Sequence, residues 1–142
     1  RLPPAWLPPS PPACRPASRA ALRSACRSAP TRRAPIGTII GSRSGDKGGN
    51  ANLGVFARSD EAWAWLDQFL TPDKLRELLP ETAAYVIDRH RLPSIRSLNF
   101  VIHGLLEEGV AASTRRDPQA KSLGEWLRAR FVDIPTSLLQ GT

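Results

Sequence analysis

A glycine-rich polar stretch, residues 41–52, lies between two apolar runs, residues 36–40 and 53–57. Its four glycines free the backbone to take positive φ angles and to turn tightly. Such a stretch is typical of two structures. One is a tight hairpin whose glycines serve its geometry, and the other is a loop whose N–H groups bind an anion. Side chains with hydrogen-bonding groups surround this backbone: Ser42, Arg43, Ser44, Lys47, Asn50 and Asn52.

The stretch differs from the known phosphate-binding motifs. Asp46 stands where a Walker A motif has the glycine before its lysine, and Gly48 replaces the serine or threonine that would hold magnesium. Three interpretations stay open: a structural hairpin, a contact to an anion such as a CoA phosphate, and catalysis. The candidate ligand-binding residues are Arg43, Ser44, Gly45, Asp46, Lys47, Gly48, Asn50 and Asn52, together with His103.

The net charge of +7 is confined to one part of the chain. Residues 1–34 carry seven arginines and no acid, whereas residues 35–142 carry thirteen basic and thirteen acidic side chains. A charge-neutral domain in which Phe100 is the lone aromatic residue of the predicted central strands is atypical of an RNA-binding sheet. We therefore expect no specific nucleic-acid partner.

Composition also divides the chain into segments. Residues 1–34 are rich in Pro, Arg and Ala and predict a disordered extension or translated sequence upstream of the true start. A targeting segment and a basic arm for a nucleic acid or a membrane surface are the alternatives. Residues 35–136 form the predicted domain, and residues 137–142 form a short tail. Both cysteines, Cys14 and Cys26, lie in the extension, and the chain has two histidines, so we expect neither a domain disulfide nor a metal or other cofactor. No apolar run approaches the ~20 residues of a membrane span, which favours a cytoplasmic protein.

The periodicity of residues 35–136 predicts an α+β fold. Helices are expected to start at the caps Ser59 and Thr71, and a third at Asp117. Alternating or apolar runs predict strands over residues 35–41, 51–58, 85–92, 98–103 and 131–134. This order corresponds to a ferredoxin-like split βαβ sandwich, an antiparallel sheet with two helices on one face.

The choice of first strand decides whether the glycine-rich stretch meets His103. If residues 36–41 are the first strand, they are expected to pair in parallel with residues 98–103 and bring the two features to one edge. If residues 51–58 are the first strand, the two features are expected at opposite ends. We favour the first arrangement. For His103 itself, a core histidine bonded to a carbonyl and a proton-transfer or ligand role both stay open.

Three blocks of sequence resemble the C-terminal ferredoxin-like domain of acyclic terpene utilisation (AtuA-like) proteins. They are residues 42–48, residues 52–58 and residues 98–104, which read SRSGDKG, NLGVFAR and LNFVIHG. The resemblance covers about residues 36–135. It implies a role in the catabolism of acyclic terpenoids and related branched acids as CoA thioesters, and supplies no catalytic residues.

These observations together predict an accessory or oligomerising domain in that catabolism, whose partner is a second copy or a larger AtuA-like chain. The exposed sheet face or the tryptophans Trp63 and Trp65 would supply the partner surface. The alternative is a domain that binds an anion or a CoA thioester, or acts as an enzyme, through residues 42–50 and His103.

Overall fold

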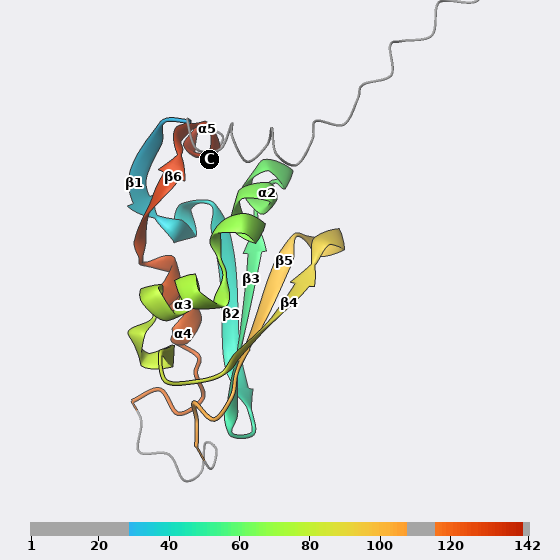
Figure 1. The fold of residues 1–142 in the computed structure, drawn as a ribbon, viewed down its shortest axis with the longest axis vertical. Helices are drawn as coiled ribbons and strands as arrows, with labels where there is room; N and C mark the ends of the chain where they lie inside the picture. Colours follow the sequence, from blue (N-terminus) through green and yellow to red (C-terminus); the bar gives the residue numbers. More distant parts are fainter. Residues whose placement is uncertain (1–28, 108–115, 141–142) are drawn as a thin grey trace, which may run out of the picture.

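The computed structural model describes residues 29–107 and 116–140 (Figure 1). The strands are β1 (Thr31–Pro35), β2 (Ile40–Lys47), β3 (Asn50–Ala57), β4 (Ile87–Leu92), β5 (Ser97–Ile102) and β6 (Phe131–Pro135). The helices are α2 (Asp60–Phe69), α3 (Pro72–Leu78), α4 (Leu123–Arg128) and α5 (Thr136–Leu139), with short 3₁₀ turns η1 (Ile36–Thr38), η2 (Pro80–Thr82) and η3 (Pro93–Ile95).

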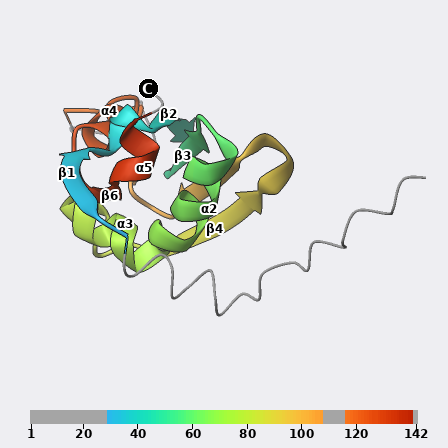
Figure 2. The same cartoon turned by 90° about the horizontal axis from the view of Figure 1, so that it is seen from above.

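Four strands form one antiparallel sheet in the order β2-β3-β5-β4. The helices α2, α3 and α4, and a second sheet made of β1 and β6, lie on one side of it (Figure 2). The predicted α+β class, with an antiparallel sheet and helices on one face, is confirmed. The strands β3 and β4 run in the same direction on either side of β5, which is the split βαβ arrangement.

The core lies between this sheet and the helices. Along β3 every second residue from Ala51 to Ala57 is buried, and along β5 the buried residues are Leu98, Phe100 and Ile102. Because successive side chains of a strand point to opposite faces, this alternation leaves the other face of the sheet uncovered by apolar packing.

Two helix starts agree with the sequence. The Ser59 hydroxyl accepts a hydrogen bond from the Ala62 N–H at 3.1 Å, and the Thr71 hydroxyl accepts one from the Lys74 N–H at 3.2 Å. The predicted start at Asp117 is wrong, because α4 begins at Leu123. The Asp117 carboxylate instead accepts the N–H groups of the two residues just before that helix, at 3.0 and 2.9 Å.

The first strand of the split unit is β3, so the prediction that favoured residues 36–41 is wrong. Residues 36–38 form the 3₁₀ turn η1. The parallel central pair is also corrected, because β3 and β5 are antiparallel. Antiparallel neighbours place the start of one strand beside the end of the other, so the glycine-rich turn and His103 still meet at one edge.

The second sheet changes the expected segment boundary. Residues 31–34, assigned above to the extension, belong to β1 and pair with β6, and the Ile36 N–H donates to the Arg130 carbonyl at 2.8 Å. A two-residue turn joins β2 to β3, and β2 forms the outer edge of the main sheet. The last strand, β6, does not join this sheet and pairs with β1. Residues 1–28, with both cysteines, lie outside the described part of the chain.

Candidate functional site

The glycine-rich stretch is a β-hairpin. Lys47 pairs with Asn50, and the two residues between them make the turn. Gly48 has φ +64°, the positive value at the first turn position that a type II′ turn requires. The structure thus agrees with the hairpin interpretation of the backbone.

One side of the hairpin is fixed to α4. The Ser42 hydroxyl donates to the Gly124 carbonyl at 2.8 Å, while the Ser44 hydroxyl donates to the Lys121 carbonyl at 3.1 Å and accepts the Gly124 N–H at 3.0 Å. A Cβ on Gly124 would lie 2.8 Å from the Ser42 oxygen, so only glycine allows this approach. Ser44, a candidate ligand-binding residue, is therefore engaged in packing, and Asp46 lies on the same side of β2.

Apart from Gly48 in the turn, the other candidates lie on the side of the sheet away from the helices, which we call the open face. None of the described helices or strands packs on it (Figures 1 and 2). Pleat alternation and strand register assign to the open face Gly41, Arg43, Gly45 and Lys47 of β2, Asn50, Asn52, Gly54 and Phe56 of β3, Asp88, His90 and Leu92 of β4, and Ser97, Asn99 and Val101 of β5.

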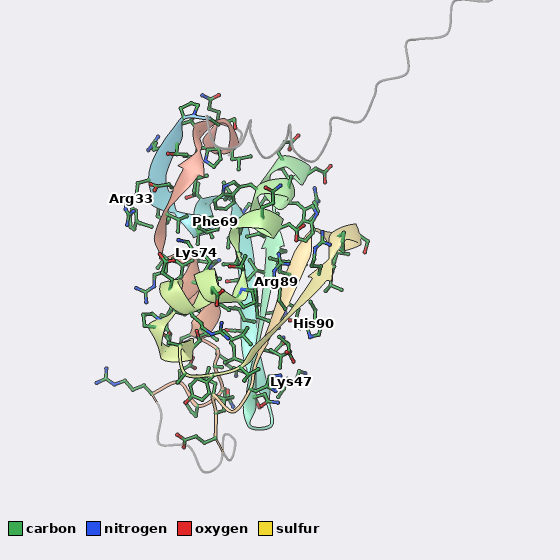
Figure 3. The ribbon with its side chains drawn as sticks, viewed as in Figure 1. Arg33, Lys47, Phe69, Lys74, Arg89 and His90 are labelled. Atoms are coloured by element: carbon green, nitrogen blue, oxygen red, sulfur yellow. The ribbon has the colours of Figure 1, made fainter. Side chains whose placement is uncertain are left out.

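Figure 3 shows the two sides of β4: Arg89 reaches toward the helices and His90 points away from them. The Arg89 guanidinium donates to the Asp67 carboxylate at 2.9 Å and to the Leu70 carbonyl at 3.0 Å. Hydrogen bonds from Arg91 are the main reason that the pKa of Asp67 lies below its usual range; burial opposes this shift and Arg89 adds to it. This cluster ties the end of α2 to β4 and belongs to the packing side.

The turn end of the open face carries a histidine–carboxylate pair. The Nε2 atom of His103 lies 2.6 Å from an Asp88 carboxylate oxygen, and both side chains are about half exposed, at 43% and 53%. His103 is therefore not the core histidine considered above. Nearby, the Asn50 side-chain oxygen accepts the Gly104 N–H at 2.9 Å. The structure thus places Asn50 and His103 at the same end of the sheet as Lys47, which Figure 3 labels at the hairpin turn.

Two glycines of the open face are not required by the described fold. A Cβ on Gly45 would have no atom within 4 Å, and one on Gly54 would meet only the Arg43 carbonyl at 3.6 Å. Neither glycine has a positive φ. Gly41 differs, because the Phe56 ring covers it at 2.1 Å from an added Cβ. Bare glycines inside a strand often mark a place where another backbone or a ligand approaches closely.

Exposed apolar side chains lie at the opposite end of the open face. Phe56 is 47% exposed and Leu92 is 43% exposed, and register places both in one row across the sheet. The two tryptophans expected to supply a partner surface do not offer one: Trp65 is buried and stacks on Phe69 at 4.4 Å between ring centres, and Trp63 is partly buried against the core.

Sequence reasoning missed several members of the open face. Asp88 carried no signal because its partner His103 is fifteen positions away, and Asn99 looked like an ordinary strand residue. The strand alternation could have found both, once the buried side of β5 was identified.

Within residues 29–107 and 116–140, no group of three or more His, Cys, Asp or Glu side chains could hold a metal ion. In that part of the chain, no helix combines the length and the apolar character needed to cross a membrane.

Comparison with known proteins adds one match. A family model described as the AtuA ferredoxin-like domain matches residues 34–133. That range contains the four-stranded sheet, the whole open face and the helices α2, α3 and α4. No curated protein and no solved structure matches the chain.

Proposed function

Because this chain belongs to the AtuA ferredoxin-like domain family, we propose that it is an accessory assembly domain that binds another AtuA-like polypeptide through its open face. The process it serves is the catabolism of acyclic terpenoids and branched acyl-CoA compounds, as the resemblance of its sequence blocks implies. The observation that carries the proposal is the pair of bare glycines, Gly45 and Gly54, on a sheet face that no described element covers.

Two further features support a polypeptide as the occupant. The open face extends across four paired strands, and a pocket lined by Ile39, Arg58, Ser59, Glu61, Ala62, Ser137 and Leu138 lies elsewhere, at the start of α2. Phe56 and Leu92 offer exposed apolar area beside polar strand residues, a mixture that matches the composition of non-obligate protein interfaces.

Two exposed phenylalanines allow a matched test of this proposal. Phe56 lies on the open face and is 47% exposed, whereas Phe131 lies on β6 in the other layer and is 56% exposed. A photo-crosslinking phenylalanine analogue is placed at either position in the full chain, expressed in the organism that encodes it. We expect a discrete adduct only at Phe56, in which mass spectrometry identifies an AtuA-like chain or a second copy of this chain.

Substitutions at the same two positions test the proposed role in the catabolism of acyclic terpenoids. Phe56→Arg should slow growth on an acyclic terpenoid as sole carbon source, and Phe131→Arg should not, with equal growth of both strains on acetate. Equal adducts at the two positions, or none at Phe56, would contradict the assembly function.

A second candidate is a domain that binds a CoA thioester or another anion at the turn end of the open face. The contact between His103 Nε2 and Asp88 favours it, because this contact fixes the imidazole while its Nδ1 atom stays outside the pair. Lys47 on the same end would attract a phosphate group. The N–H groups with which β2 and β3 face each other are used in the hydrogen bonds of the hairpin. Side chains, rather than a nest of N–H groups, would therefore bind the anion.

A further inference from the structure

We propose that the occupant of the open face is a second copy of this chain, docked face to face about a two-fold axis parallel to the strands. In this arrangement β2 of each copy lies over β4 of the other. The inference rests on the proposed function, since it names the partner of the same surface. Face-to-face sheets with nearly aligned strands are a common packing geometry, with about 10 Å between the sheets.

The charges of the open face are divided between its two edges. Arg43 and Lys47 lie on β2 at one edge, and Asp88 lies on β4 at the other. None of the ion pairs within the described residues involves Arg43 or Lys47. Among the residues that the structure describes, Asp88 forms an ion pair only with His103, and it keeps 53% of its side chain exposed. A surface that is basic at one edge and acidic at the other can complement itself.

Strand register selects the axis. Gly45, Asn52, Val101 and Asp88 form one row across the sheet. A two-fold axis parallel to the strands sets each row against the same row of the other copy in reverse order. Asp88 then faces the Gly45 of the other copy, and the two cations of that β2 stand about 7 Å to either side along the strand.

The other in-plane axis, perpendicular to the strands, sets β2 against β2. Arg43 and Lys47 of one copy would then face the same cations of the other. Like charges that face each other across an interface disfavour association, so the axis parallel to the strands is favoured.

Two further features of the open face, one in the Gly45 row and one in a second row, fit the same arrangement. Gly45 carries no side chain above the backbone and leaves room for the facing Asp88. In the row of Gly41, Phe56, Ser97 and Leu92, the Leu92 of one copy faces the Phe56 ring that lies over Gly41 of the other. The apolar contact thus forms at one end of the face and the charge contact at the other.

The size of the face sets the expected strength of association. Four strands about 4.8 Å apart and six residues long make a face of about 19 by 20 Å. This footprint of about 380 Å² per copy is smaller than that of standard specific interfaces and is typical of weak, transient complexes. We therefore expect a reversible dimer with a dissociation constant in the micromolar range.

The test is a charge exchange in the full chain, followed by sedimentation equilibrium at pH 8 with a reducing agent to prevent disulfides between extensions. One variant, Asp88→Lys, makes both edges basic. A second, Arg43→Asp with Lys47→Asp, makes both edges acidic. Each should weaken self-association at least about tenfold, whereas the Asp73→Lys control on α3, where the Asp73 side chain is 94% exposed, should leave it unchanged.

An equimolar mixture of the two variants should recover dimers, because each contact then joins a basic edge to an acidic one. Recovery also shows that both variants are folded. A wild-type chain that stays monomeric up to about 500 µM, or a mixture that does not recover dimers although both variants unfold cooperatively, overturns the inference. An adduct of Phe56 with a different AtuA-like chain would overturn the dimer and leave the assembly function standing, whereas the absence of any adduct would refute the function itself.

Discussion

Replacing Asp67 by asparagine should destabilise the domain by about 2 kcal/mol. The carboxylate accepts three charged hydrogen bonds, one from Arg89 at 2.9 Å and two from Arg91 at 2.8 and 2.6 Å. Asparagine keeps the shape and loses the charge. The Arg91 side chain is 54% exposed, so solvent screens its interaction with the carboxylate and its share of the loss is the smaller one. Arg89 is 18% exposed and loses a charged partner, which costs about 1.5–3 kcal/mol. It keeps its bonds to two backbone carbonyls, so we expect the lower end of that range.

The pH dependence of this effect has a definite sign. The folded-state pKa of Asp67 is lowered from the ordinary value of 3.8, chiefly by the hydrogen bond from Arg91. A lowered pKa stabilises the folded state above the unfolded pKa, and this contribution is lost as the pH falls through the folded pKa. The stability difference between wild type and Asp67→Asn should therefore be constant near neutral pH and shrink as the pH falls below about 4.

Urea unfolding followed by tryptophan fluorescence at pH 7 and pH 3 measures both quantities. A loss of about 2 kcal/mol corresponds to a lowering of the melting temperature by about 10 °C for a domain of this size. The matched control is Asp73→Asn, which breaks an exposed pair with Arg76 and should cost less than about 0.5 kcal/mol. A loss below 0.5 kcal/mol for Asp67→Asn, or a difference that grows in acid, would show that the cluster does not tie α2 to β4.

Two further predictions concern the two faces of the sheet. Phe100 is fully buried, so Phe100→Ala should cost about 3–5 kcal/mol in urea unfolding, whereas Phe56→Ala at the half-exposed open face should cost less than about 1 kcal/mol; equal losses would mean that the strand register is shifted. A CoA thioester at millimolar concentration should shift the backbone amide resonances of Lys47, Asn50 and His103 if the second candidate function is right, with inorganic phosphate as the comparison ligand. Unmoved resonances would contradict it.

The sequence alone was sufficient for the local elements whose signals lie within a few residues. Ser59 and Thr71 start helices because a hydroxyl can reach an N–H three residues ahead. The alternation of β3 and β5 follows from the period of the strand, and it separates the buried side from the open face once a strand is recognised. The class of fold and the family followed from these elements and from three short sequence blocks.

The tertiary structure decided everything that depends on which strands are neighbours. The pairing of β1 with β6 joins residues about a hundred positions apart, and the arginine-rich sequence of β1 gives no local sign of it. Ser44 resembled a loop ligand and proved to hold α4, because its partners at Lys121 and Gly124 are nearly eighty positions away. The meeting of His103 with the hairpin turn depends on the antiparallel direction of β5 beside β3. Direction and order are set by the packing of the whole sheet against its helices, and no segment encodes them by itself.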